Sequence, residues 1–184
     1  MKRALVAAAL CGAFAAAHAD GFTLSSPDIK ANGTIAQRFE FNGFGCAGDN
    51  KSPALKWSGA PAGTKSYAVT VYDPDAPTGS GWWHWVVLNL PATTNELPAD
   101  AGAAEGKSLP AGAMMIRSDY GQRAWGGVCP PPGDKPHRYV FSVYALKTDK
   151  LDVPADASPA LAGFMINANK LGKASFTARY GRPK

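Results

Sequence analysis

The hydrophobic pattern along the chain predicts three buried β-strands, at 66–72, 83–90 and 138–146. Each segment is rich in β-branched and aromatic residues and has turn-forming residues on both sides, a composition typical of strands. Both faces are apolar over much of their length. We therefore expect these strands to be covered on both sides, in the middle of a sandwich or under a helix. Weaker patterns predict further strands at 22–25, 38–41 and 175–180.

One helix is predicted towards the end of the chain. Ser158 suits the N-cap position and Pro159 suits the first turn. Apolar side chains then recur at helical spacing, at Leu161, Phe164, Met165, Ala168 and Leu171. This spacing predicts that they face the core, and Gly172 is expected to end the helix.

Several strands combined with one late helix predict a mainly β fold, a sandwich with a peripheral helix. A parallel α/β sheet would need a helix between successive strands, and the stretch between Asp73 and Trp83 is too short to hold one. Residues 91–112 are rich in Ala, Gly and Pro, which predicts a loop.

The start of the chain resembles a secretory signal peptide. Lys2 and Arg3 give it a positive end, residues 4–17 are apolar, and Ala17-His18-Ala19 fits the small-x-small cleavage rule. We expect cleavage near Ala19, which would make the protein periplasmic or secreted in a bacterium. Residues 1–19 would then be the leader and residues 20–184 a single domain. No apolar run is long enough to predict an integral membrane span.

Charge and cysteine content refine this picture. Loss of Lys2 and Arg3 with the leader lowers the formal net charge from +5 to +3, and the charges are dispersed, so no nucleic-acid partner is predicted. Of the three cysteines, Cys11 lies in the leader, which leaves Cys46 and Cys129. Two thiols in an exported protein favour a disulfide. A pair of metal ligands is the alternative.

The first candidate group for chemistry is Asp73-Pro74-Asp75-Ala76-Pro77, directly after a predicted strand. The prolines exclude a helix. An extended backbone would send the side chains of Asp73 and Asp75 to the same side. The two carboxylates could belong to a site, or they could cap the amides of their own turn.

The second candidate group is Gly81-Trp82-Trp83-His84-Trp85. His84 is either a core histidine held by a backbone carbonyl or the polar floor of a pocket. Strict alternation predicts His84 and Val86 on one face of the strand, with Trp83 and Trp85 on the other.

The third candidate group is the Gly- and Pro-rich segment 125–133 together with the residues that follow it, among them His137, Arg138 and Tyr139. The amides of such a stiff loop could line a ligand. The alternative is a surface loop with Arg138 in a structural ion pair. If the three strongest strands are neighbours, all three groups meet at one end of the sheet and form a small polar pocket with aromatic walls.

These motifs resemble the phosphatidylethanolamine-binding protein family, the Raf kinase inhibitor-like proteins. The resemblance rests on Asp73-Pro-Asp-Ala-Pro77, Trp82-Trp-His-Trp85 and Pro130-Pro…His137-Arg-Tyr139, and extends from Phe22 to about Tyr180. Ser52-Pro53…Leu55-Lys-Trp57, and Cys129 before the prolines, resemble the bacterial branch.

The resemblance implies a central antiparallel β-sandwich with peripheral helices. It also implies a small anion pocket that takes phosphate, acetate or a phospholipid head group such as phosphoethanolamine. By position, it implies the ligand-binding residues Asp73, Asp75, His84, Pro130, His137 and Tyr139. We expect Trp82 and Tyr120 as walls of the pocket, and a Cys46–Cys129 bridge that would pin two pocket loops.

The resulting prediction is a binding protein, not an enzyme, that needs no cofactor and selects the protonated form of a phosphate. Two other classes stay open. One is a metal-dependent phosphoester hydrolase that uses Asp73, Asp75, His84 and His137 as ligands, although the chain has no HExxH helix. The other is an inhibitor that binds a protease or kinase, with the pocket in a regulatory role. A serine hydrolase is disfavoured because no G-x-S-x-G elbow is present.

Overall fold

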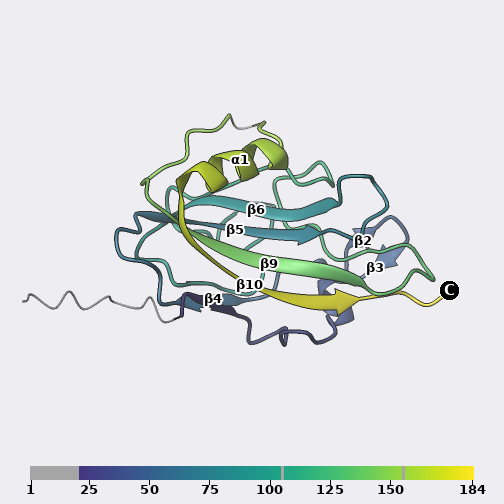
Figure 1. The fold of residues 1–184 in the computed structure, drawn as a ribbon. Coiled ribbons are helices and arrows are strands. Elements are labelled where there is room, and N and C mark those ends of the chain that lie inside the picture. Colours follow the sequence, from purple (N-terminus) through teal and green to yellow (C-terminus); the bar gives the residue numbers. More distant parts are fainter. Residues whose placement is uncertain (1–20, 105, 155) are drawn as a thin grey trace, which may run out of the picture.

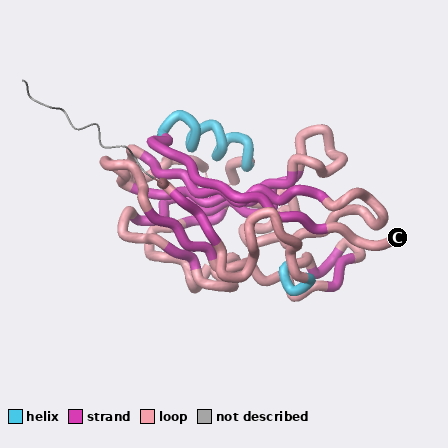
Figure 2. Tube along the Cα trace, turned by 60° about the horizontal axis from the view of Figure 1, so that its bottom comes forward, coloured by secondary structure: helices cyan, strands magenta, loops and turns pink. Residues whose placement is uncertain are grey.

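The computed structural model describes residues 21–104, 106–154 and 156–184. Within these ranges the chain is mainly β, with ten strands, one α-helix and one short 3-10 helix (Figures 1 and 2). The predicted leader and its cleavage site lie outside the described residues. None of the helices in the described part is long and apolar enough to span a membrane.

A five-stranded antiparallel sheet forms the centre of the molecule. Its strand order is β10 (Lys170–Tyr180), β9 (His137–Leu146), β5 (Ser66–Asp73), β6 (Trp82–Pro91) and β8 (Met114–Met115). The three strongest predicted strands are confirmed as β5, β6 and β9, and they are direct neighbours. Because β5 lies in the middle, apolar residues on both of its faces are buried, as the sequence pattern requires.

A smaller antiparallel sheet packs against one face of the large one, which confirms the predicted sandwich. It consists of β1 (Thr23–Ser25), β4 (Leu55–Ser58) and β7 (Glu96–Leu97). The core between the sheets includes Leu55 and Trp57 from the small sheet, and Val71 and Phe141 from the large one. Figure 1 shows β4 on one side of the large sheet and the helix on the other.

The helix α1 (Pro159–Asn169) covers the opposite face of the large sheet and forms a second core with it. Ser158 caps it as predicted, by accepting a hydrogen bond from the amide of Leu161. The prediction that Gly172 ends the helix was wrong, because the chain enters β10 at Lys170.

The predicted core face of α1 was wrong at most of its positions, although Met165 packs against the second core as expected. Leu161 and Phe164 are 41% and 69% exposed, while the buried residues are Pro159, Ala162 and Ile166. Leu171 lies in β10 and is 42% exposed. Apolar residues occur around most of this helix, so their spacing alone does not select a face. On the buried face Ala162 is small, which allows the helix to lie close to the sheet.

The predicted strand at 38–41 is absent. Gln37–Phe39 form a short 3-10 helix, and Glu40 makes an isolated bridge to Val128. A small hairpin follows, made of β2 (Asn42–Gly43) and β3 (Cys46–Ala47). The side chain of Phe39 is nevertheless buried in the core. The apolar residue that suggested a strand therefore belongs to a short turn of helix instead.

Candidate ligand-binding pocket

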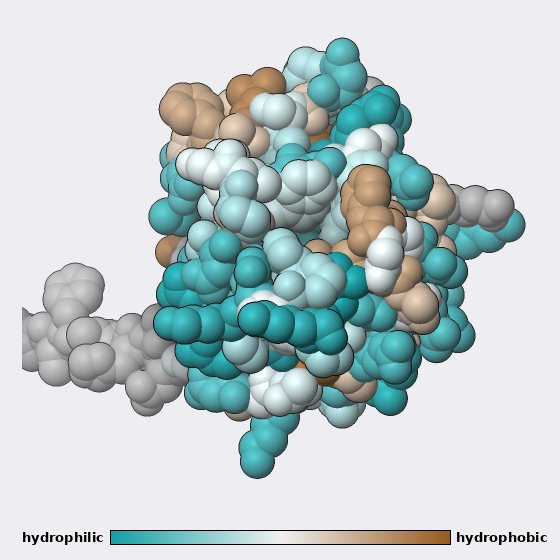
Figure 3. Space-filling view, turned by 90° about the vertical axis from the view of Figure 1, so that its right-hand side faces the viewer, coloured by the Kyte–Doolittle hydropathy of each residue, from teal (hydrophilic) through white to brown (hydrophobic). Residues whose placement is uncertain are grey.

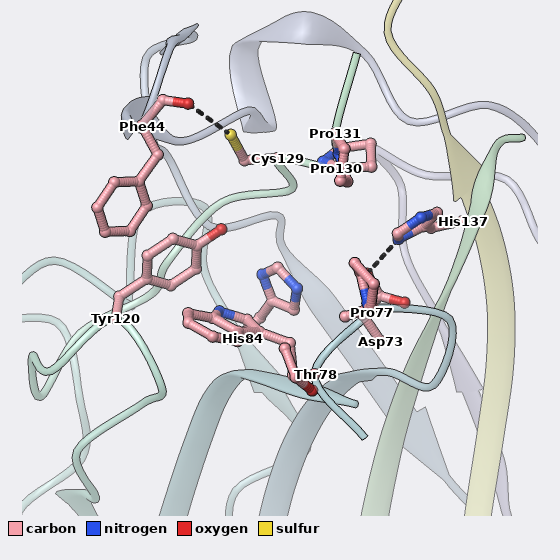
Figure 4. A pocket seen from close by; sticks show the side chains of 12 residues that line it. Phe44, Asp73, Pro77, Thr78, His84, Tyr120, Cys129, Pro130, Pro131 and His137 are labelled. Atoms are coloured by element: carbon pink, nitrogen blue, oxygen red, sulfur yellow. Dashed lines mark hydrogen bonds and ion pairs between the residues drawn. The ribbon is translucent and has the colours of Figure 1, made fainter. Parts of the chain in front are cut away.

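A cavity of about 170 Å³ opens at one end of the large sheet. There, β5 ends at Asp73, β6 begins at Trp82 and β9 begins at His137, which confirms that the three candidate groups meet at one place. The residues that line the cavity are Phe44, Asp73, Ala76, Pro77, Thr78, Trp82, His84, Tyr120, Cys129, Pro130, Pro131 and His137 (Figure 4).

A β-bulge on β6 turns His84 towards this cavity. Val71 of β5 pairs with Trp85, but Tyr72, the next residue, pairs with Trp83. His84 is therefore an extra residue on its strand, and a bulge of this kind puts two successive side chains on the same face. The prediction that Trp83 and Trp85 share a face was wrong because strict alternation fails at a bulge.

The two tryptophans consequently belong to different cores. Trp85 lies in the core between the sheets, whereas Trp83 packs against the core under α1. The ring of His84 lies on the side of Trp85, with its centroid 5.1 Å from that of Tyr139. Because of the bulge, the side chain of His84 forms the floor of the pocket.

The hydrogen bonds of His84 define its protonation. Its Nδ1 lies 2.7 Å from the carbonyl oxygen of Gly126 and 3.1 Å from that of Gly127. Since both partners are acceptors, Nδ1 carries the proton. Burial lowers the pKa of His84 below the usual histidine value, so the ring is neutral at pH 7. Its Nε2 is then an acceptor, and this buried atom has no hydrogen-bond partner among the described residues.

Asp73 orients the second histidine of the pocket. Its Oδ2 accepts a hydrogen bond from Nδ1 of His137 at 2.8 Å, and its Oδ1 accepts one from the backbone amide of Asp75 at 2.8 Å. Asp73 and His137 are both buried. Nε2 of His137 lies 3.6 Å from Oδ2 of the more exposed Asp134. Asp73 is thus at once a turn cap and a site residue, the two roles that the sequence offered as alternatives.

Asp75 does not share this role. Its carboxylate accepts hydrogen bonds from Nε and Nη2 of Arg138 at 2.6–3.2 Å and one from the Arg138 amide at 2.8 Å. These bonds lower the pKa of Asp75 to about 2. Asp75 is not among the cavity-lining residues. Its interaction is instead the structural ion pair that was the alternative interpretation of Arg138.

Aromatic side chains form the wall of the cavity. The hydroxyl of Tyr120 donates to the carbonyl oxygen of Gly127 at 2.9 Å, and its ring stacks on Phe41 at 4.1 Å. Trp82 lines the cavity, and its buried Nε1 has no hydrogen-bond partner among the described residues. Tyr139 is fully buried behind His84 and does not line the cavity, so its contribution is to support the histidine ring.

The proline loop supplies shape to the cavity. Pro130 and Pro131 line it, but prolines have no N–H to donate. The amide of Gly133 donates to the carbonyl oxygen of Arg182 at 3.0 Å. The amide of Gly133, one of those expected to line a ligand, is therefore already used within the protein.

Sequence reasoning missed Phe44, which lines the cavity although it is 73% exposed. It lies in the hairpin between β2 and β3, where its φ is +51°. Glycines on both sides of Phe44 were the available signal, because they indicate a tight turn that could present the ring to solvent.

Two links hold the hairpin against the proline loop. The predicted disulfide is present, and joins Cys46 to Cys129 with a Cα–Cα distance of 6.1 Å. Arg182 makes the second link: its Nε donates to the carbonyl oxygen of Pro130 and its Nη1 to that of Gly45, both at 2.7 Å. These two links hold the hairpin, which carries Phe44 on the outer wall of the cavity, against the proline loop.

The four residues of the hydrolase alternative do not form a ligand set. Asp75 faces Arg138, and both carboxylate oxygens of Asp73 already accept hydrogen bonds. Across the described ranges, no group of three or more His, Cys, Asp or Glu residues is arranged to hold a metal ion. The geometry instead offers one buried acceptor, one oriented histidine and an aromatic wall.

Comparison with known proteins gives consistent results for sequence and structure. The chain is 53% identical to the UPF0098 protein YbcL of Escherichia coli K12 over 98% of both chains. It is 48% identical to YbhB of the same organism, covering 85% of this chain and 98% of YbhB. It is also 32% identical to LppC of Mycobacterium tuberculosis, named as a candidate lipoprotein, covering 88% of this chain and 73% of LppC.

The crystal structure of E. coli YbcL, described as a member of the mammalian PEBP family, superposes on this chain with a TM-score of 0.85. The match covers 87% of this chain and 98% of the chain in that crystal structure, at 56% identity. The family model described as phosphatidylethanolamine-binding protein matches residues 25–181. The chain belongs to the phosphatidylethanolamine-binding protein family.

Proposed function

We propose that this protein is an exported, non-catalytic receptor for small acidic ligands of the phosphate type, such as phosphate or phosphoethanolamine. The observation that carries the proposal is the buried Nε2 of His84, which lines a cavity and has no hydrogen-bond partner among the described residues. A buried polar atom without a partner is costly, and a ligand atom in the cavity would satisfy it.

The protonation state of His84, on the floor of the cavity, determines which protonation state of the ligand can bind. A neutral His84 accepts at Nε2, so the ligand must present an O–H group there. A singly protonated phosphate has such a group and still carries a negative charge. Nε1 of Trp82 can donate a hydrogen bond to one of the remaining oxygens. The carboxylate of Asp73 lies beside His137 and repels a dianion more strongly than a monoanion.

Affinity for a phosphate monoester should therefore fall as pH rises through its second pKa of about 6. Because burial keeps the pKa of His84 below the usual histidine value, the ring stays neutral at pH 7 and above. The groups that face it are the carboxylates of Asp73 and Asp119 and the phenols of Tyr120 and Tyr139. Burial raises the pKa of both phenols, so they stay neutral as well.

The test is calorimetric titration of the mature protein with phosphoethanolamine at pH 5.5 and 8.0. We expect binding at least about tenfold weaker at pH 8.0, because the protonated form becomes scarce. The variant His84→Asn can keep a donor near the Gly126 carbonyl but lacks Nε2, and should bind at least about tenfold more weakly at pH 5.5. Equal affinity at both pH values, or full binding by a folded His84→Asn variant, would overturn the proposal.

Export is the second part of the proposal. The leader-like residues 1–19 and the Cys46–Cys129 disulfide support it, since structural disulfides persist mainly in oxidising compartments. The naming of the relative LppC as a candidate lipoprotein also supports it. We propose a periplasmic or secreted protein after cleavage near Ala19.

A further inference from the structure

We propose that a second cavity, beside the hairpin of β2 and β3, binds small zwitterions that carry an ammonium group and a carboxylate, with free amino acids as the chemical class. In this site Glu40 holds the ammonium group and Arg182 holds the carboxylate. The site is independent of the anion pocket, because the two cavities have no lining residue in common.

The second cavity has a volume of about 440 Å³ and lies where three segments far apart in the sequence meet. These are the 3-10 helix with the hairpin that follows it, the proline loop and the end of β10. The polar side chains of its lining are Gln37, Glu40, Tyr180 and Arg182. Figure 3 faces this end of the molecule and shows a surface on which hydrophilic side chains predominate, beside smaller apolar groups. The cavity therefore suits a small polar molecule.

Glu40 provides the cavity with a buried carboxylate that has no cationic partner. Glu40 is only 4% exposed, and its Oε2 accepts a hydrogen bond from the amide of Ala47 at 3.1 Å. Burial and the neighbouring Glu40 carboxylate raise the pKa of Tyr180, so this phenol stays neutral. None of the ion pairs among the described residues includes Glu40. Because a buried carboxylate is costly without a compensating positive charge, a ligand cation beside Glu40 would be stabilising.

Arg182 adds a positive group to the same cavity. Its Nε and Nη1 donate to the carbonyl oxygens of Pro130 and Gly45, and these bonds fix the position of the guanidinium group. Nη2 remains, and it has no hydrogen-bond partner among the described residues. Guanidinium N–H groups bind carboxylates through charge-assisted hydrogen bonds. Arg182 can therefore bind the carboxylate of a ligand while it keeps both of its bonds to the backbone.

The presence of both charges favours a zwitterion over a ligand with a single charge. Glu40 and Arg182 line the same cavity, but they are not among the ion pairs of the described residues. A simple amine would be attracted by Glu40 and repelled by Arg182, and a simple carboxylate would meet the opposite situation. A molecule that carries both groups can satisfy the two side chains at once. The fixed position of Arg182 also reduces the entropic cost of binding.

The experiment is an NMR titration of the isotope-labelled protein at pH 7, followed at the amide of Ala47, which is bonded to Glu40. The zwitterionic probes are glycine, β-alanine and 4-aminobutyrate, which differ in the separation of their charges. Ethylammonium and propionate are probes with one charge each. We expect the best of the three zwitterions to bind at least about tenfold more tightly than either of them, because each lacks one charge-assisted hydrogen bond.

Three variants identify the site. Glu40→Gln keeps an acceptor for the Ala47 amide but removes the charge, and should weaken binding of the best zwitterion at least about tenfold. Gln37→Lys places an ammonium group at the exposed rim of the cavity, where it competes with that of the ligand, and should weaken binding similarly. Glu96→Gln is the matched control and should bind as the wild type does, because this exposed glutamate pairs with Lys56 and does not line the cavity.

A fourth variant separates the two cavities. His84→Asn changes the anion pocket alone and should keep the affinity for the zwitterion. Loss of zwitterion binding in this variant would place the ligand in the anion pocket and overturn the second site. Failure of all three zwitterions to bind, or equal affinity for ethylammonium or propionate, would also overturn it. So would full binding by a folded Glu40→Gln variant, and if that variant does not fold, full binding by Gln37→Lys decides. None of these results would affect the proposed binding of phosphate.

Discussion

At the scale of single residues, the two aspartates of Asp73-Pro74-Asp75 have different roles although they are only two positions apart. Asp73 is buried and orients His137 in the pocket, whereas Asp75 holds Arg138 outside it. The sequence correctly placed both at the end of a strand. It could not predict the division of roles, because this depends on Arg138, which lies 63 positions away in the chain.

This division predicts different effects of two isosteric substitutions. Asp73→Asn removes the negative charge beside His137, so a dianion should be tolerated better, and the ratio of affinities at pH 5.5 and 8.0 should fall below that of the wild type without reaching one, because His84 still needs a protonated ligand. Asp75→Asn should lower affinity only indirectly, through Arg138, and keep the ratio of the wild type. Calorimetry with phosphoethanolamine at both pH values measures the ratios. Similar ratios in the two variants would contradict the assignment.

At the scale of the elements, the sequence predicted which segments form the buried strands, because this depends on composition. It did not predict which side chains face the core where the regular spacing is interrupted or ambiguous. The strands β5, β6 and β9 were predictable because apolar residues on both faces require burial on both sides. The direction of His84 was not, because one bulge reverses the alternation. The core face of α1 was not either, because leucine and phenylalanine on its outer face imitate a core stripe.

The orientation of α1 can be tested by stability. Ile166→Ala should lower the free energy of unfolding by about 2–4 kcal/mol, because Ile166 is buried against the large sheet. Phe164→Ala, on the exposed face, should change it by less than about 0.5 kcal/mol. Urea titration followed by tryptophan fluorescence gives both values. A larger loss for Phe164→Ala than for Ile166→Ala would restore the face that the spacing predicted.

At the scale of the whole molecule, the pocket and the proposed destination of the protein are connected. The floor is carried by the sheet, but the outer wall is held by a disulfide, a bond that an oxidising compartment maintains. The sequence predicted this bond from the presence of a leader and two remaining cysteines. It had no signal for the parallel link through Arg182, since a single arginine close to the end of a chain is common and its partners are backbone atoms.

Export and bridge formation can be tested together by the intact mass of the protein from an extracytoplasmic fraction. The mass should correspond to a chain that begins at Asp20 and lacks two hydrogen atoms, as expected for one disulfide. Without a reducing agent, neither Cys46 nor Cys129 should react with an alkylating reagent. A chain that keeps residues 1–19, or two reactive thiols in the native protein, would contradict the proposal.

The link made by Arg182 has a consequence for the order of folding. Its bond to Gly45 joins residues 137 positions apart, and the disulfide joins residues separated by 83. Contacts between such distant residues form late, because a long loop of chain must close first. The outer wall is thus completed only when the last strand and the segment after it are in place. Ligand binding would then report a finished fold, because a chain in which Arg182 is not yet in place lacks one of the two links of the outer wall.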